Sequence, residues 1–207
     1  EKEILNFNPV SSYKTTAEFI NTNGIKFKSK YSINTNDDDN FSSFIEGFKD
    51  AEFSVSTIKK SPLSKKPSPP FTTSTMQQEA ARKLGFNVSR TMQTAQRLYE
   101  SGHITYMRTD SVTLSESAQN SIKSAIEIKF GSNYYQSRNF SNKSKNAQQA
   151  HEAVRPTNFL NNIKNLDADQ SNLYDLIWRR TLASQMSDAK VDKTTVKIKS
   201  NNHEGIF

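Results

Sequence analysis

The stretch SGHITYMRTDS, residues 101–111, decides how the middle of this chain folds and what chemistry it can support. It breaks a run of helical periodicity with Ser-Gly, and then places Tyr106, Arg108 and Asp110 at alternate positions. In an extended chain, residues two apart share one face at a spacing of about 6–7 Å. The three side chains are therefore expected to point the same way. Tyr106 is then either an aromatic residue packed in a core or a nucleophile with a cation beside it.

The nucleophile interpretation depends on Arg108. A phenol with a pKa near 10 is mostly protonated at neutral pH, so its attack on phosphorus needs assistance. A guanidinium binds phosphate oxygens in a fork and stabilises the charge that builds on them. Asp110 could orient a donor at the same site. For an isolated Y-x-R pattern, however, an amphipathic strand with a surface arginine is the commoner interpretation.

A second group of polar residues occurs in AHEAVRPT, residues 150–157. If this segment is helical, His151 and Arg155 stand one turn apart on one face, with Glu152 between them and Pro156 ending the turn. They could hold a phosphate or donate to the tyrosine site, although a solvated helix end is the usual meaning of such a pattern. The sequence has no His or acidic cluster at metal-ligand spacing and no glycine-rich phosphate loop.

The first third of the chain is predicted to be mainly β. Alternating apolar positions flank Asn23-Gly24, which is a strong hairpin signal because both residues tolerate positive φ. A short amphipathic helix, capped by Asn40, is expected from the phenylalanine spacing in 41–48, and a third strand is expected in 52–60. The acidic run 37–39 is predicted to be a solvated loop rather than a metal site.

The segment KKSPLSKKPSPPF, residues 59–71, holds four prolines and is predicted to be an irregular linker. Beyond it the periodicity becomes helical. Ser74 with Gln77 indicates a capping box, Ser89 a second cap, and Gly85 and Gly102 the ends of the first two helices. Four helices, within 74–85, 89–102, 115–131 and 167–186, precede a return to strand alternation at 193–200. The order predicts an α+β fold in which a helical part is inserted into a sheet domain.

The composition limits the classes of function. The chain has 207 residues, a net charge of +7 and no cysteine, so disulfides and thiolate zinc sites are excluded. Most of the surplus of positive charge lies in 67–160, which carries eleven Lys or Arg against six Asp or Glu and modestly favours a nucleic-acid partner. No apolar run approaches the roughly 18 residues of a membrane span, so no membrane partner is expected.

Three segments together carry a family resemblance: KPSPPFTTSTMQQEAARKLGF, TMQTAQRLYESGHITYMRTDS and QQAHEAVRPT. They resemble the central region of the bacterial type IA DNA topoisomerases. The opening EKEILNFNPVSSY and the helix LYDLIWRRTLASQM are similar to the same family in the same order. The likeness covers most of the chain, is densest over residues 66–116, and reverses the preference for a surface arginine.

The resemblance implies that Tyr106 is the nucleophile that forms a 5′-phosphotyrosine during single-strand cleavage, strand passage and ATP-independent religation, which relaxes negatively supercoiled DNA. It implies that Arg108 positions the phosphate and stabilises the transition state. Thr109, Asp110 and His151 match positions that support the site or bind DNA, and Glu152 and Arg155 match less securely.

The same resemblance gives the expected architecture and partners. Residues 67–190 are expected to be the helical, tyrosine-carrying domain, and residues 1–66 and 191–207 parts of a β-rich arch domain. The linkers Pro62–Pro70 and Met186–Asp192 would act as hinges. The family's Mg²⁺ is held by an N-terminal Toprim domain that nothing here matches, so the chain is expected to be an inactive fragment of a cytoplasmic enzyme that binds single-stranded DNA.

Three other interpretations remain open from the residues alone. The helices within 74–102 and the extended segment after them could form a non-catalytic winged-helix-like module that binds DNA. A tyrosine recombinase or type IB topoisomerase is disfavoured, because its H-x-x-R precedes the tyrosine, whereas H-x-x-x-R follows Tyr106 here. A purely structural fragment is disfavoured only by the basic charge around the motif.

Overall fold

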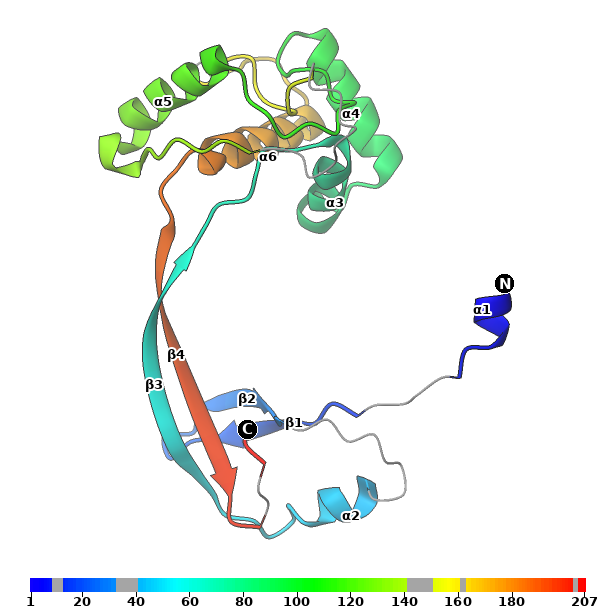
Figure 1. Cartoon of the computed structure of the whole chain (residues 1–207), viewed down its shortest axis with the longest axis vertical. Helices are drawn as coiled ribbons and strands as arrows, with labels where there is room; N and C mark the ends of the chain where they lie inside the picture. Colours follow the sequence, from blue (N-terminus) through cyan, green and yellow to red (C-terminus); the bar gives the residue numbers. More distant parts are fainter. Residues whose placement is uncertain (9–12, 33–40, 141–150, 161–162, 203–204) are drawn as a thin grey trace. The chain divides into compact units, whose positions relative to one another are not determined.

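The chain has an α+β fold in which the longer helices gather in one part, and most of the strand residues and two short helices belong to another (Figure 1). This is a computed structural model, and it describes residues 1–8, 13–32, 41–140, 151–160, 163–202 and 205–207. The helices are α1 (Lys2–Leu5), α2 (Phe41–Glu46), α3 (Thr73–Leu84), α4 (Val88–Glu100), α5 (Glu116–Phe130), the 3-10 turn η1 (Ser132–Tyr134) and α6 (Ala168–Ser184). The strands are β1 (Thr16–Ile20), β2 (Lys26–Lys30), β3 (Phe53–Lys65) and β4 (Ala189–Ser200).

Two compact units make up the chain. One consists of residues 1–63 and 191–207, and the other of residues 64–190. The chain therefore passes between them after residues 63 and 190, where the sequence predicted changes of domain after 66 and 190.

The strand unit begins with the expected hairpin, in which β1 and β2 pair antiparallel with Thr16 opposite Lys30 and Ile20 opposite Lys26. The connection differs from a two-residue turn. Gly24 has φ 77°, whereas Asn23 is not among the residues with positive φ. The Asn21 side chain instead accepts hydrogen bonds from the N–H groups of Asn23 and Ile25 at 3.0 and 2.8 Å. The side chain of Asn21 therefore shapes a longer loop, and only the glycine needs the left-handed region.

The second sheet is a ribbon of β3 and β4. β3 continues through Pro62 to Lys65, so the irregular linker expected from residue 59 is confined to 66–70. Proline is tolerated because both strands of a two-stranded ribbon are edge strands, where one missing N–H need not break a ladder.

Aromatic side chains form the core of the strand unit. Tyr31, Ile198 and Phe207 are buried, and Phe19, Phe44 and Phe48 pack against them. Ring contacts link the hairpin, α2 and the ribbon; for example, Phe19 meets Phe53 edge to face at 5.1 Å. The predicted cap Asn40 and the acidic run Asp37–Asp39 lie outside the described residues.

In the helical unit, α6 lies across the middle of the other helices (Figure 1). Its Leu173, Leu176 and Ile177 pack with α3, α4 and Phe71, while its Leu182 packs with α5 and Phe159. Two ion pairs join α4 to the start of α6: Arg90 to Asp169 at 2.7 Å and Arg97 to Asp167 at 2.7 Å. One helix thus supports both halves of the unit.

The N-terminal caps of α3 and α4 lie two residues before the positions that the sequence predicted. Thr72 caps α3 in a box with Thr75, and Asn87 caps α4, whereas Ser74 and Ser89 were expected. Gly85 ends α3 in the left-handed conformation as predicted, with φ 67°. After α4, the described residues form single β-bridges rather than the hairpin of a wing.

Candidate active site

The segment after α4 is held by backbone hydrogen bonds to residues 153–157. Ile104 bridges Pro156, and the N–H of Thr105 donates to the carbonyl of Arg155 at 2.9 Å. Val154 in turn bridges Phe71, which comes just before α3. Residues 151–156 are therefore extended, and the expected helical turn that would put His151 and Arg155 on one face is wrong. Pairing on both sides of the segment outweighs its helical spacing.

Burial alternates from residue to residue along 106–111, although this segment is not a regular strand. Tyr106, Arg108 and Asp110 are all exposed, so they share one environment as their alternate positions predicted, and that environment is solvent. The intervening residues Met107, Thr109 and Ser111 are buried.

Threonine hydroxyls fix the motif on both sides of Tyr106 and Arg108. The Thr73 hydroxyl donates to the carbonyl of Met107 at 2.6 Å and accepts from the N–H of Thr109 at 2.8 Å. The Thr105 hydroxyl donates to the carbonyl of Ala153 at 2.7 Å and accepts from the N–H of Arg155 at 3.0 Å. The short stretch between them is thereby held to α3 at one end and to residues 153–155 at the other.

Tyr106 is accessible from solvent. Its side chain is 44% exposed, and its ring meets that of Tyr99 edge to face with centroids 5.2 Å apart. Tyr99 lies on α4, so this contact orients the ring while nearly half of the residue stays exposed. A tyrosine that fills a core would have the opposite exposure.

Arg108 differs from every other arginine of the chain. The other seven are held by a carboxylate or, in the case of Arg180, by the carbonyl of Pro69 and the ring of Phe71. Among the described residues, Arg108 has no hydrogen bond, ion pair or ring contact. Because an arginine without a counter-ion keeps all five N–H donors available, Arg108 is suited to bind an anion from solution.

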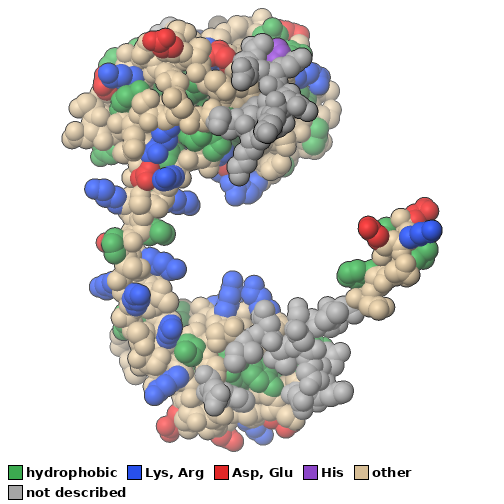
Figure 2. Space-filling view, in the orientation of Figure 1, with side chains coloured by type: hydrophobic (Ala, Val, Ile, Leu, Met, Phe, Trp, Pro, Cys, Tyr) green, Lys and Arg blue, Asp and Glu red, His purple; other side chains and the backbone are tan. Residues whose placement is uncertain are grey.

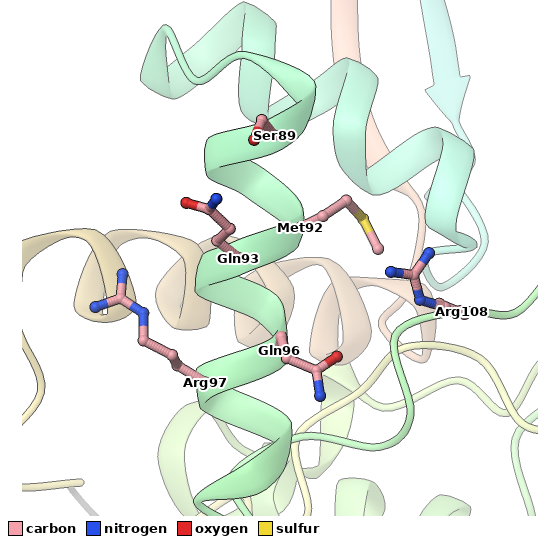
Figure 3. A pocket seen from close by; sticks show the side chains of 6 residues that line it. All are labelled: Ser89, Met92, Gln93, Gln96, Arg97 and Arg108. Atoms are coloured by element: carbon pink, nitrogen blue, oxygen red, sulfur yellow. The ribbon is translucent and has the colours of Figure 1, made fainter.

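Two open hollows meet at Arg108. One of about 800 Å³ lies along α4 and is lined by Ser89, Met92, Gln93, Gln96, Arg97 and Arg108. In Figure 3, Met92 and Gln96 of α4 project toward Arg108. The other hollow, of about 520 Å³, is lined by Thr72, Thr73, Ser74, Arg108, Thr109, Asp110 and His151.

The second hollow brings together most of the predicted site residues. Arg108, Thr109, Asp110 and His151 all line it, although His151 is about forty residues further along the chain. Hydroxyl-bearing residues at the start of α3 form the opposite wall. The hollow therefore offers a guanidinium, an imidazole, a carboxylate and several hydroxyls to one polar ligand.

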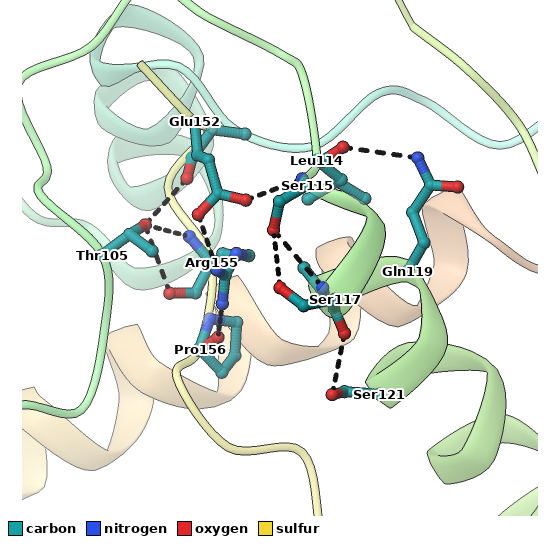
Figure 4. Close-up of polar contacts among 11 residues, drawn as sticks. Thr105, Leu114, Ser115, Ser117, Gln119, Ser121, Glu152, Arg155 and Pro156 are labelled. Carbon is teal, nitrogen blue, oxygen red and sulfur yellow. Dashed lines mark hydrogen bonds and ion pairs between the residues drawn. The ribbon is translucent and has the colours of Figure 1, made fainter. Parts of the chain in front are cut away.

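Glu152 and Arg155 lie behind the site rather than in either hollow. They pair at 2.6 Å, and Glu152 also accepts from the N–H of Ser115, the cap of α5, at 2.7 Å (Figure 4). Burial alone would raise the pKa of Glu152, but the hydrogen bonds from Arg155 and Ser115 outweigh it and hold the pKa below its usual range. This ion pair ties the extended segment 152–155 to α5.

Sequence reasoning missed three contributors: Thr73, Thr105 and Tyr99. Their roles depend on contacts across 7 to 50 positions, and their residue types are common, so no local pattern distinguishes them. The only available signal was position, because Thr105 lies within SGHITYMRTDS and Thr73 lies within KPSPPFTTSTMQQEAARKLGF.

The described residues contain neither a metal-binding cluster nor a membrane-spanning helix. Within the described ranges, no three His, Asp or Glu side chains come together in a way that could hold a metal ion. In the same part of the chain, no helix has the length and apolar character needed to cross a membrane.

Comparison with known proteins gives one consistent family. The family model described as DNA topoisomerase matches residues 1–206. DNA topoisomerase 1 of Zymomonas mobilis is 49% identical over 157 residues, which is 75% of this chain and 13% of that protein. DNA topoisomerase 1 of Rickettsia bellii is 41% identical over 228 residues, or 99% of this chain and 28% of that protein.

A solved structure agrees with the sequence comparisons. Full-length topoisomerase I from Thermotoga maritima matches all of this chain with a TM-score of 0.73 and 33% identity, and the match covers 34% of that chain. This chain therefore spans only about an eighth to a third of the proteins it matches. From the match of the family model over 206 residues, and from a site built on the same motifs, the chain belongs to the bacterial type IA DNA topoisomerase family and corresponds to part of such an enzyme.

Proposed function

We propose that this chain is the part of a type IA DNA topoisomerase that carries the nucleophile. Tyr106 attacks a DNA phosphate, Arg108 holds that phosphate, and the resulting nick lets another strand pass before religation. Relaxation of negatively supercoiled DNA follows from repeating this cycle. The family assignment supports DNA as the substrate.

One observation carries the assignment of roles: Arg108 is without a partner among the described residues and lies two positions from an exposed tyrosine. A guanidinium left free in a hollow lined by hydroxyls and an imidazole suits a phosphodiester better than any neutral ligand. The 44% exposure of Tyr106 allows a strand to reach its hydroxyl.

The proposed step balances as follows. The Tyr106 oxygen forms a bond to phosphorus and gives up its proton, while the bond from phosphorus to the 3′ oxygen breaks and that oxygen leaves as a hydroxyl. The phosphate stays on the 5′ end, joined to tyrosine. Arg108 stabilises the charge on the non-bridging oxygens in both directions. Because the phosphotyrosine bond replaces one phosphodiester with another, the 3′ hydroxyl can reverse the step without ATP.

The remaining site residues have supporting roles in this proposal. Thr109 fixes the backbone beside Arg108 through Thr73, and Asp110 and His151 contact the phosphate or the strand from the same hollow. Glu152 and Arg155 keep the segment that carries His151 in place through their ion pair.

In the complete enzyme, we propose, Mg²⁺ is bound by another domain, which this chain does not match. The described residues do not fit a metal site, so no step here passes through Mg²⁺. We further propose that residues 67–190 are a helical domain inserted in a β-rich arch and that the chain alone does not relax DNA. The stretches 62–70 and 186–192 would then serve as hinges when the tyrosine domain lifts.

An alternative is a DNA-binding module in which Tyr106 only packs. The experiment that separates the two uses the full-length parent protein and a single-stranded oligonucleotide labelled at its 3′ end. We expect a labelled band retarded by covalent protein after denaturation, and its loss in Tyr106→Phe. A band that survives Tyr106→Phe would show that Tyr106 is not the nucleophile, and retardation of a 5′ label alone would give the linkage the opposite polarity.

A further inference from the structure

One face of the β3–β4 ribbon carries charged residues of a single sign. Along β4, residues 193, 197 and 199 are lysines at odd positions, so their side chains project from the same face. The same face of β4 has no acid, because Asp192 occupies an even position. Basic side chains are seen along the length of the ribbon in Figure 2.

The pairing of the strands adds a fourth lysine to this face. The N–H of Asn201 donates to the carbonyl of Glu52 at 3.1 Å, and the Ser56 hydroxyl donates to the carbonyl of Lys197 at 3.1 Å. Both contacts place Ser56 opposite Lys197. Lys60 lies four residues further along β3, so alternation puts it on the same face as Ser56. We call Lys60, Lys193, Lys197 and Lys199 the lysine face.

The opposite side of the ribbon has a different role. There Ile198 is buried and Phe53 meets the aromatic rings of the core. The four lysines of the lysine face are all exposed, and within the described residues none of them forms an ion pair. The ribbon thus packs on the core only near Phe53 and Ile198, whereas the lysine face is exposed along its length.

The charge of the lysine face is not a by-product of a basic unit. Residues 1–63 and 191–207 contain eleven lysines and eleven acidic residues, and no arginine. The unit is therefore neutral overall, yet its acids are excluded from one face of the ribbon. Like charges that are neighbours on one face of a sheet repel each other, as Lys197 and Lys199 do at two residues apart. An arrangement that costs stability is explained if an anion screens it.

We propose that the lysine face binds the phosphate backbone of a DNA strand, at a site separate from Tyr106 and Arg108. The partner is a polyanion with regularly spaced charges, because Lys193, Lys197 and Lys199 extend over about 20 Å at the rise of a strand. Lysine ammonium groups contact phosphates without reading sequence, and the face has no aromatic side chain on which bases could stack. Binding is therefore sequence-independent and strongly dependent on salt.

The test compares two triple substitutions in the 207-residue chain. One removes the charges of the lysine face on β4 by Lys193→Gln, Lys197→Gln and Lys199→Gln. The matched control removes three lysines from the opposite face by Lys59→Gln, Lys65→Gln and Lys190→Gln. Fluorescence anisotropy of a labelled 30-nucleotide strand and of a 30-base-pair duplex, each titrated at several KCl concentrations, gives the salt dependence of binding.

Removing three phosphate contacts lowers the slope of log K against log [KCl] by about 2 for the single strand and about 3 for the duplex. We expect that change in the β4 triple variant and an unchanged slope in the control. Equal changes in both variants, or no change in either, would overturn the proposal. Binding to anionic phospholipid vesicles but not to DNA would overturn it as well.

Two further measurements separate this proposal from its rivals. Lys60→Gln relieves repulsion within the lysine face, so we expect the melting temperature to stay the same or rise, whereas a folding role for these lysines predicts a fall. The proposal rests on the proposed function only in taking DNA as the partner. The Tyr106 adduct of the parent protein tests that function independently of the salt slope.

Discussion

Thr73 holds both peptide groups that flank Arg108, through a 2.6 Å hydrogen bond to the carbonyl of Met107 and a 2.8 Å hydrogen bond from the N–H of Thr109. A single hydroxyl at the start of α3 therefore determines where the guanidinium stands. The relationship makes Thr73 a positioning residue in the proposed reaction, although it need not touch DNA.

Substitution of Thr73 gives the first prediction. Thr73→Val keeps the shape and removes the hydroxyl, so we expect about 1–2 kcal/mol loss in the free energy of unfolding. In the parent protein, the rate of covalent adduct formation should fall about tenfold to a hundredfold, because the site tolerates little displacement. Thr73→Ser retains the hydroxyl and should recover most of the rate. Equal rates in Thr73→Val and the unmodified protein would contradict the role.

Arg108 gives the second prediction, because function and stability should separate there. Arg108→Gln removes no partner in the described structure, so the free energy of unfolding should change by less than about 0.5 kcal/mol. Adduct formation should fall by about a hundredfold or more, with Arg108→Lys recovering only part of it. Arg155→Gln is the matched control, because it leaves Glu152 without its cation and should destabilise the fold. Urea unfolding and single-turnover cleavage measure the two effects.

The third prediction concerns pH. Because the pKa of Glu152 is lowered by folding, its ionised form contributes stability above the ordinary value of 4.5, and that contribution is lost as the pH falls through the lower folded value. Glu152→Gln should therefore unfold about 2 kcal/mol more easily at pH 7, and the difference should shrink as the pH falls below about 4.5. Glu127→Gln, at an exposed position of α5, is the matched control and should change the free energy of unfolding by less than about 0.5 kcal/mol at pH 7. A constant difference for Glu152→Gln across pH would show that packing, not charge, is responsible.

Gly85 gives the fourth prediction. Its φ of 67° suits glycine, and a Cβ added there would meet no atom within 4 Å, so only the backbone conformation resists substitution. Gly85→Ala should cost about 1 kcal/mol. Gly85→Asn should cost less, because asparagine enters the left-handed region more readily. Equal costs in thermal unfolding would point to some other cause.

Periodicity predicted the elements of this fold better than their ends. All four helices of the helical unit and the strand at 193–200 were predicted, because their apolar positions repeat with the right period. The caps of α3 and α4 were misplaced because several residues that can cap stand close together. Thr72 and Ser74 are two residues apart, as are Asn87 and Ser89. Only the direction in which the chain enters each helix decides which residue of a pair is the cap.

The sequence predicted which residues belong to the candidate site, but not the contacts that bring them together. The shared face of Tyr106, Arg108 and Asp110 followed from their alternate positions, but its exposure to solvent did not. The extended conformation near His151 did not, because it depends on bridges to Phe71 and Ile104 that are distant in the chain. The lack of a partner for Arg108 among the described residues was equally hidden, because a sequence shows which arginines exist but not which carboxylates reach them.

The hydrogen bond from the Ser64 hydroxyl to the Asp188 carboxylate, 2.7 Å long, joins residues near the two ends of the helical unit. Arg138 also forms an ion pair with Asp188, so the contact between the two ends is fixed to the interior of the same unit. A segment whose ends meet can be removed or transplanted without leaving a gap in its own structure. Residues 64–190 should therefore behave as a transferable module, one that protein engineers could express alone or graft between two adjacent strands of another scaffold.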